Sequence, residues 1–183
     1  SYIHICLNET VHGVEFFGCP DLNSIDRGNV PLVVDMSSNI LSKNIDFTNI
    51  DLAYASAQKN IGPAGLAIVI IRKDLIQKRD DLPALMSYQT YADSESMYNT
   101  PPTFAWYLSG KVFSWLKRNG GLKSIEEINL GTAKKLYDYI DNSDFYYNDV
   151  SIESRSIMNV PFLLNDDSLN DSFLKESEKE GLL

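Results

Sequence analysis

Residues 51–72 set the fold class, and they read Asp51-Leu-Ala-Tyr-Ala-Ser-Ala57-Gln-Lys59-Asn-Ile-Gly-Pro-Ala-Gly65-Leu-Ala-Ile-Val-Ile-Ile-Arg72. Two short apolar runs, 51–57 and 65–72, are typical of buried strands. The link between them, residues 59–64, is short and rich in turn-forming residues. Because a parallel return needs a long crossover, the second run is expected to pair antiparallel to the first.

Two earlier segments add strands to this sheet. Residues 2–7 alternate two largely apolar faces, which is typical of a central strand covered on both sides. Residues 31–35 read as another short buried strand, and residues 36–50 are long enough for a parallel crossover of about a dozen residues. The sequence therefore predicts an α/β layer structure with a mixed, mostly parallel sheet.

The second half of the chain predicts helices and a smaller unit. Apolar residues recur at helical spacing from Phe104 to Leu116 and stop at Gly120. A capping box at Ser124–Glu127 is expected to start a second helix that ends near Asn142. Strands over 145–151 and 158–164 and an amphipathic helix over 168–179 follow. The predicted domains are an α/β domain at 1–119 and an incomplete α+β domain at 120–183.

Composition and charge narrow the function classes. The 183 residues carry 16 basic and 25 acidic side chains, a net charge of −9, which argues against nucleic-acid binding. No apolar run approaches the roughly 20 residues that a membrane-spanning helix needs, and the first residues do not resemble a secretory signal. Two cysteines fit a reducing cytoplasm, although a Cys6–Cys19 disulfide stays an alternative. His4 and His12 are interpreted as structural, and no metal site is expected.

Lys59 is the first candidate for chemistry, because it follows a buried strand and precedes a turn rich in glycine and proline. A lysine at the end of a core strand is expected to be partly desolvated, which lowers its pKa. The neutral amine is then a nucleophile for Schiff-base chemistry. The alternative interpretation is a surface lysine that opens a turn.

Asp35 is the second candidate, since it ends the strand before the crossover. Parallel strands align their carboxyl ends along one sheet edge, where ligands of α/β proteins bind, so Asp35 and Lys59 are expected to face one pocket. That pairing suits an enzyme that binds pyridoxal phosphate. In such an enzyme a lysine forms a Schiff base with the cofactor, and a carboxylate keeps the pyridine nitrogen of the cofactor protonated. The alternative for Asp35 is an Asx-type turn or a helix N-cap.

Five ordered blocks of the chain resemble the phosphoserine aminotransferase family. They are Tyr2-Ile-His-Ile-Cys-Leu-Asn-Glu-Thr10, Val34-Asp35-Met-Ser-Ser38, Ala57-Gln58-Lys59-Asn-Ile-Gly-Pro63, Tyr98-Asn99-Thr100-Pro-Pro102 and Met158-Asn-Val-Pro-Phe162. The resemblance implies the fold-type I aminotransferase architecture, a large cofactor-binding α/β domain followed by a smaller α+β domain. It also implies a cytoplasmic homodimer with shared active sites.

The resemblance assigns roles to four residues around one cofactor. Lys59 would hold pyridoxal phosphate covalently and later shuttle a proton, while Asp35 would pair with the pyridinium nitrogen. Thr10 would hydrogen-bond the cofactor near its phenolic oxygen, and Gln58 would help to hold its phosphate.

Asn99 and Thr100 would contact the phosphate of the cofactor bound in the other subunit. The implied reaction transfers an amino group between glutamate and 3-phosphohydroxypyruvate, with phosphoserine on the product side. It belongs to serine biosynthesis and, in many bacteria, to pyridoxine biosynthesis.

The chain also departs from the family pattern. Family chains are about twice as long, and their glycine-rich phosphate loop, ring-stacking aromatic residue and substrate-binding arginines lie outside residues 1–183. Ser56 stands where the family commonly has glycine. The chain by itself is therefore expected to be inactive. Alternatives are another class-V fold-type I enzyme, such as a desulfurase, or an inactive fragment that serves only as a folded core or association surface.

Overall fold

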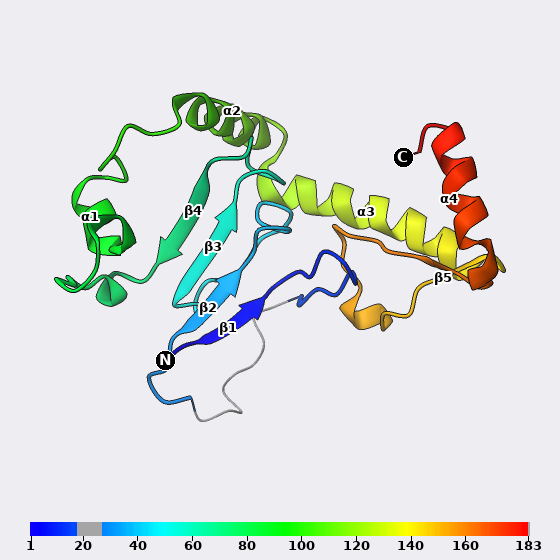
Figure 1. The fold of residues 1–183 in the computed structure, drawn as a ribbon, viewed down its shortest axis with the longest axis horizontal. Helices are drawn as coiled ribbons and strands as arrows, with labels where there is room; N and C mark the ends of the chain where they lie inside the picture. Colours follow the sequence, from blue (N-terminus) through cyan, green and yellow to red (C-terminus); the bar gives the residue numbers. More distant parts are fainter. Residues whose placement is uncertain (18–26, 183) are drawn as a thin grey trace.

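The computed structural model describes residues 1–17 and 27–182, with a four-stranded sheet at the centre (Figure 1). The sheet follows the order β1-β2-β3-β4, parallel between the first three strands and antiparallel between the last two. The predicted mixed, mostly parallel sheet is confirmed. Its strands are β1 (Ile3–Cys6), β2 (Leu32–Asp35), β3 (Leu52–Ser56) and β4 (Ala67–Ile71).

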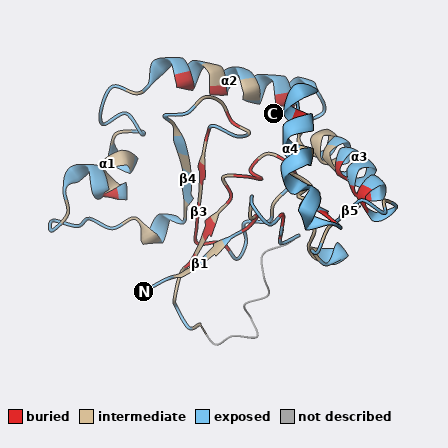
Figure 2. Cartoon of the chain, turned by 45° about the vertical axis from the view of Figure 1, so that its right-hand side comes forward, coloured by how far each residue is buried: buried red, intermediate tan, exposed pale blue. Residues whose placement is uncertain are grey.

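One face of this sheet builds the core. Alternate residues of β2 and β3 point to that face and pack against the crossover 36–50, which covers the sheet with turns rather than with a helix. Buried residues accordingly gather along the strands and the segments that follow them (Figure 2). The fully buried members include Leu32, Val34, Met36, Ala53, Ala55, Ala57 and Ile61.

The expectation that residues 2–7 form a central strand is wrong for the described part of the chain. There β1 lies at the edge of the sheet and pairs only with β2, and its side chains at His4 and Cys6 are exposed. The apolar alternation of residues 2–7 indicates which faces of the strand are covered. It does not indicate whether another strand pairs with the second edge of β1.

Within residues 1–17 and 27–182, four α-helices lie near the β4 side of the sheet or extend away from it (Figure 1). Their bounds are α1 (Tyr88–Asp93), α2 (Thr103–Arg118), α3 (Gly121–Asp141) and α4 (Asn170–Lys179). Single 3-10 turns lie at η2 (Lys73–Leu75), η3 (Ala84–Met86), η4 (Ile152–Ser154) and η5 (Asp167–Leu169). The predicted helix after Pro102 is confirmed, but the outermost residue of its expected apolar stripe, Phe104, is 70% exposed.

The predicted capping box is wrong. The helix begins at Gly121, and Gly120 precedes it in the left-handed region with φ of 89° and no side-chain cap. Glycine adopts this conformation without a Cβ clash, so the chain reverses directly after α2 and the helix starts earlier than expected. Ser124 consequently lies inside the first turn of α3.

The last third of the chain forms a small aromatic cluster. The expected strands over 145–151 and 158–164 shrink to the two-residue antiparallel pair β5 (Tyr146–Tyr147) and β6 (Leu163–Leu164). The Phe145 ring packs edge-on against Tyr146 with centroids 4.8 Å apart, and Phe173 of α4 joins the same cluster. The domain boundary at residue 119 stays a prediction.

Candidate active site

Lys59 lies at the tip of the turn that connects β3 to β4. The amides of Ile61 and Gly62 both donate to the Ala57 carbonyl, at 3.0 and 2.9 Å, which closes the turn around Lys59. The Asn60 side chain anchors it to the crossover through the Ile40 carbonyl, 2.9 Å away. Lys59 itself is exposed, so the expectation of a partly desolvated lysine is wrong for the described residues. Its turn carries it beyond the covered face of the sheet.

Gly62 lets this turn pack closely against α2. A Cβ atom at position 62 would lie 2.6 Å from the Ser109 hydroxyl oxygen, closer than any side chain tolerates without a shift. A larger residue here would have to displace the Ser109 hydroxyl, so the small size of Gly62 lets the Lys59 turn lie close beside α2 (Figure 1).

Thr10 meets Lys59 from the loop that follows β1. The Lys59 amine donates to the Thr10 hydroxyl oxygen over 2.7 Å. The Glu9 carboxylate shapes this loop by accepting the amides of Val11 and His12, at 3.0 and 2.5 Å, and these amide donors lower the pKa of Glu9. A cation and a hydroxyl group are thus held together where β1 and β3 end.

Asp35 ends β2 and makes the Asx-type turn that the sequence left open. One carboxylate oxygen accepts the amide of Ser37 at 2.8 Å, and the Ser37 hydroxyl accepts the amide of Ser56 at 3.1 Å. A carboxylate has about four lone-pair directions, so this turn leaves capacity for a ligand. The turn and a ligand-binding role are compatible at Asp35.

The Cys6 thiol, at the end of β1, responds to the charges of both Asp35 and Lys59. Burial raises the pKa of Cys6 most, the negative charge of Asp35 raises it further, and the positive charge of Lys59 lowers it. In the sheet register Cys6 and Asp35 are direct neighbours. The structure therefore brings Thr10, Asp35 and Lys59 to the edge where the parallel strands end.

Gln58, Asn99 and Thr100 are the remaining candidates, and all three are exposed. Gln58 is exposed beside Lys59. Asn99 and Thr100 are exposed and belong to the loop between α1 and α2, which lies beyond the β4 edge of the sheet (Figure 1). This structure thus groups Gln58 with Lys59 and leaves the Asn99-Thr100 pair outside the group.

Sequence reasoning did not single out Tyr54, which lies on the same face of the sheet as Asp35. Tyr54 stands beside Asp35 in the register, and its hydroxyl lies 3.0 Å from the Nε2 atom of His4. The period-two alternation of strands supplied the signal, because Tyr54 and Ser56 must share one face of β3. The pairing register was needed to set Tyr54 beside Asp35.

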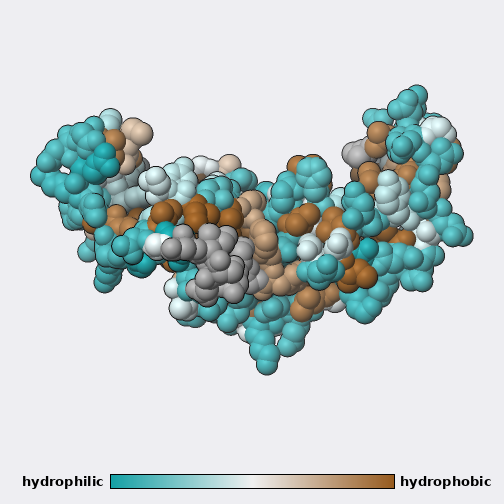
Figure 3. All heavy atoms as spheres, turned by 90° about the horizontal axis from the view of Figure 1, so that it is seen from below, coloured by the Kyte–Doolittle hydropathy of each residue, from teal (hydrophilic) through white to brown (hydrophobic). Residues whose placement is uncertain are grey.

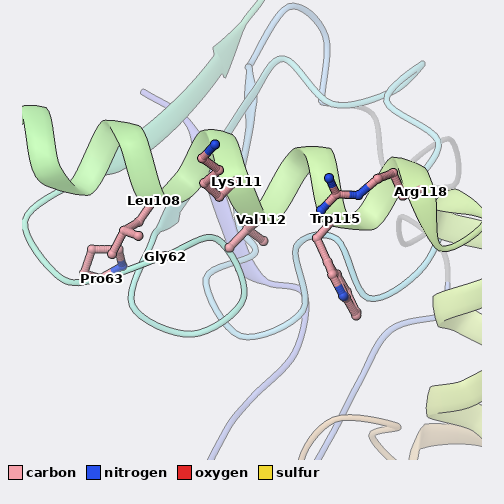
Figure 4. Close-up of a pocket in the computed structure, with 7 residues that line it drawn as sticks. All are labelled: Gly62, Pro63, Leu108, Lys111, Val112, Trp115 and Arg118. Carbon is pink, nitrogen blue, oxygen red and sulfur yellow. The ribbon is translucent and has the colours of Figure 1, made fainter.

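A groove of about 530 Å³ lies along α2, and neither Thr10 nor Asp35 lines it (Figure 4). It shares only the end of the Lys59 turn with the site just described. Its lining contains no carboxylate or hydroxyl group, so we place the candidate chemistry at Lys59. The lining residues are Gly62, Pro63, Leu108, Lys111, Val112, Trp115 and Arg118.

The family model "Aminotransferase class-V" matches residues 1–179 of this chain. The chain belongs to the class-V aminotransferase family. Within the family it is 53% identical to the phosphoserine aminotransferase of Pseudoalteromonas translucida and 52% identical to that of Hahella chejuensis, and both matches cover 100% of the chain and 50% of the relative. The chain thus spans about half the length of these curated relatives.

Solved structures agree with the class-V membership. Phosphoserine aminotransferase from Bacillus circulans subsp. alkalophilus superposes with a TM-score of 0.90 at 43% identity, over 98% of this chain and 49% of that one. The pyridoxal-phosphate-bound enzyme from Trichomonas vaginalis gives 0.88 at 37% identity, over 100% and 51%. Alanine–glyoxylate aminotransferase from Nostoc sp., at 16% identity and 0.78 over 97% of this chain and 50% of that one, shares the fold.

Membrane-spanning helices and metal-binding clusters are both absent from the described residues. No helix within residues 1–17 and 27–182 is long and apolar enough to cross a membrane. Over the same residues, His, Cys, Asp and Glu side chains form no group of three that could hold a metal ion. The alternative of a Cys6–Cys19 disulfide falls outside the described residues, which do not include Cys19.

Proposed function

We propose that this chain is the cofactor-lysine part of a phosphoserine aminotransferase, which transfers an amino group between glutamate and 3-phosphohydroxypyruvate. The observation that carries the proposal is the Lys59–Thr10 contact of 2.7 Å at the sheet edge where Asp35 also ends its strand. The names of the relatives at 52–53% identity support the same activity.

The residues present fit pyridoxal phosphate as a donor set. Lys59 supplies an amine for a carbonyl carbon, and Asp35 keeps an oxygen available for a protonated ring nitrogen. Thr10 accepts from Lys59, so its own hydroxyl proton is available to donate to a phenolate oxygen. The cofactor supplies an electron sink for the carbon that loses or gains the amino group.

Each residue then has a defined task in the proposal. Lys59 holds the cofactor and moves a proton to and from the reacting carbon, as a positioned general base does. Asp35 would pair with the ring nitrogen and hold its proton. Thr10 orients the ring from the β1 side, and Gln58, exposed next to Lys59, helps to bind the phosphate.

The proposal extends to the assembly and its setting. Asn99 and Thr100 are exposed in the loop between α1 and α2, which suits residues that complete the site of a second subunit, so we infer a homodimer. The enzyme would act in the cytoplasm, in serine biosynthesis and in pyridoxine biosynthesis. Residues 1–119 would form the cofactor domain and residues 120–183 part of the small domain.

The test is Lys59→Ala in the full-length polypeptide that the proposal implies. We expect the variant to fold, to lose the visible absorbance that borohydride removes, and to lose transamination, because the amine is both nucleophile and base. Lys78→Ala, which removes a lysine that is 80% exposed, is the matched control and should behave as wild type. A Lys59→Ala enzyme that retains the absorbance and normal turnover would contradict the assignment.

The substrate is tested separately. Wild-type enzyme should form 2-oxoglutarate from glutamate only when 3-phosphohydroxypyruvate is added. Equal turnover with glyoxylate and alanine, or release of sulfide from cysteine, would point to a different class-V reaction.

A further inference from the structure

Two adjacent serines, Ser37 and Ser38, directly follow β2 and make contacts that the proposed function does not use. Ser37 is half-buried, and Ser38 is 6% exposed. Their hydrogen bonds reach the Asp35 turn, the end of β3 and the loop after β1. Each of these three segments carries one candidate residue of the site, so the serine pair connects all three.

Ser37 connects the Asp35 turn to the end of β3. Its amide donates to the Asp35 carboxylate at 2.8 Å and forms the Asx-type turn. Its hydroxyl accepts the amide of Ser56 at 3.1 Å. Lys59 follows Ser56 by only three residues, so the strand end that carries the lysine is held against the turn that carries the carboxylate.

The Ser37 hydroxyl replaces a backbone acceptor at the point where the β2–β3 ladder ends. The last regular bond runs from the Met36 amide to the Tyr54 carbonyl, at 2.9 Å. A parallel ladder would next send the Ser56 amide to the Met36 carbonyl. That carbonyl instead accepts the Ile40 amide at 2.8 Å, because the chain turns there. Without the Ser37 hydroxyl, the Ser56 amide would lose its acceptor, which costs free energy in a folded protein.

Ser38 holds the loop that carries Thr10. Its hydroxyl donates to the Asn8 carbonyl at 2.5 Å and accepts from the Asn8 side-chain nitrogen at 2.8 Å. The directions are fixed, since a carbonyl only accepts and an amide nitrogen only donates. The Asn8 side-chain oxygen in turn accepts from the Ser156 hydroxyl at 2.5 Å. Asn8 is fully buried and Thr10 lies two residues further on, so Ser38 anchors the base of this loop.

The contact at the centre of the site depends on both anchors. Thr10 and Lys59 are 49 positions apart in the sequence, and their side chains meet over 2.7 Å. Functional groups need to be held within about 0.5 Å of their productive geometry by surrounding hydrogen bonds and packing. Adjacent serines that hold the loop and the end of β3 provide such support, because they move as one rigid piece of backbone.

We propose that Ser37 and Ser38 are positioning residues that hold the three candidate residues of the site in place around the cofactor. The inference rests on the proposed function, since it presumes a cofactor at these residues. Ser37 acts through Asp35 and Lys59, and Ser38 acts through Thr10. Loss of either hydroxyl should therefore loosen the orientation of the bound cofactor in a protein that is still folded.

A matched pair of substitutions tests Ser37 in the full-length holoenzyme. Ser37→Thr keeps the hydroxyl acceptor, and Ser37→Val has nearly the same shape without it. Both keep the amide that binds Asp35. In Ser37→Val we expect weaker visible circular dichroism of the bound cofactor, which reports its fixed orientation, and a kcat about tenfold lower, as for the loss of one hydrogen bond. Ser37→Thr should restore both. A purely structural role would lower the unfolding midpoint and leave the visible circular dichroism of the folded enzyme unchanged.

A double-mutant cycle tests whether Ser38 acts through Thr10. Ser38→Ala alone should lower kcat about tenfold, whereas Ser38→Ala combined with Thr10→Ala should be close to Thr10→Ala alone. In the full-length protein without cofactor, the amides of residues 9–15 should exchange hydrogen faster in Ser38→Ala than in wild type. Ser114→Ala, which removes an exposed hydroxyl that donates within α2, is the control and should match wild type in all measurements.

The outcomes separate this inference from the proposed function. A wild-type protein that binds no cofactor and transfers no amino group would overturn both. An active wild-type enzyme that Ser37→Val and Ser38→Ala match in kcat and visible circular dichroism would overturn the positioning role alone. Losses that multiply in the double variant would overturn the role of Ser38. If Ser38→Ala fails to fold, the two Ser37 variants decide, because threonine and valine fill the same space at this half-buried position.

Discussion

At the scale of single residues, Asp35 combines two tasks that the sequence offered as alternatives. Its Asx-type turn to Ser37 is a local backbone feature, whereas its position at the end of β2 places it on the sheet edge where Lys59 and Thr10 meet. The two tasks depend on different properties of the side chain. The turn needs an accepting oxygen, and the pairing with a ring nitrogen needs a negative charge.

Asp35→Asn separates these tasks. The amide oxygen can still accept the Ser37 amide, so the fold and cofactor affinity should change little. An amide cannot hold the pyridinium proton, and removal of such a fixed electrostatic partner should lower kcat by about 10²–10³-fold. Steady-state kinetics with a cofactor titration measure both effects. Equal turnover in the two proteins would restrict Asp35 to the turn.

Much of the site could be predicted from the sequence, because its residues follow strand ends. Lys59 and Asp35 come directly after apolar runs, and parallel pairing aligns such ends. Tyr54 and His4 could not be placed in this way, since they lie inside strands and meet only through the sheet register. The exposure of Lys59 was missed for a related reason: a short apolar run shows that a strand is buried but does not show how far its turn projects.

At the scale of elements, the loop after β1 connects the sheet to the last third of the chain. The buried Asn8 side chain donates to Ser38 and to Asn159, each at 2.8 Å, and accepts from Ser156 at 2.5 Å. A few residues on, the buried Glu15 carboxylate pairs with Lys43 at 2.7 Å. Because the same loop carries Thr10, these contacts set the position of one side of the candidate site.

Gly13 should be irreplaceable in this loop. Its φ is 68°, and a Cβ atom there would lie 2.3 Å from the Pro161 ring. Left-handed strain plus overpacking should make Gly13→Ala less stable by about 2–5 kcal/mol in urea unfolding. Gly131→Ala, in open space within α3, is the control and should stabilise by about 0.5–1 kcal/mol. A Gly13→Ala variant as stable as wild type would show that the loop can separate from Pro161.

Asp51 ties three strands together and makes their stability depend on pH. It accepts the Leu32 amide at 2.7 Å and pairs with Arg27 at 3.0 Å and with Arg72. Burial by itself would raise the pKa of Asp51, but these donors outweigh it and the pKa is lowered from 3.8. The stabilisation is thus present above pH 3.8 and is lost as the pH falls toward the lower folded pKa.

Asp51→Asn should therefore lower the free energy of unfolding by about 1.5–3 kcal/mol at pH 7, and the difference from wild type should shrink below pH 4. Urea unfolding at several pH values measures it. Asp80→Asn, at a side chain that is 85% exposed, is the control and should match wild type throughout. A difference that stays constant down to acid pH would contradict the role of the Asp51 charge.

Elements were predicted more accurately than their ends. The apolar periodicity located α2, because helical spacing over sixteen residues is a strong signal. The start of α3 was missed because a left-handed glycine began the helix before the Ser124–Glu127 box. The short β5–β6 pair was overestimated, since apolar residues there serve an aromatic cluster rather than a long ladder.

At the scale of the whole molecule, much apolar surface stays uncovered in the described residues. Figure 3 shows such surface in several places on one face of the chain. Along α2, Phe104, Tyr107 and Trp115 are 70%, 61% and 50% exposed. Exposed patches of this kind mark interaction surfaces. They are consistent with relatives twice as long and with a site assembled from more than one segment.

The position of Asn99 and Thr100 yields the last prediction, which follows from the proposed homodimer. If their loop completes the partner's site, a subunit with Asn99→Ala and Thr100→Ala should retain the cofactor poorly, and a Lys59→Ala subunit should be inactive. A hybrid dimer of the two should recover up to about half of one wild-type dimer's turnover, because one of its two sites combines an intact Lys59 with an intact Asn99-Thr100 pair. Mixing the full-length variants under conditions that exchange subunits, followed by activity measurement, tests this.

Lys78→Ala mixed with the same Asn99→Ala, Thr100→Ala double variant controls for exchange, since the Lys78→Ala subunit has both an intact Lys59 and an intact Asn99-Thr100 pair. If the subunits exchange but no activity is recovered, Asn99 and Thr100 would serve the same subunit as Lys59. That result would contradict the shared site proposed for their exposed loop between α1 and α2.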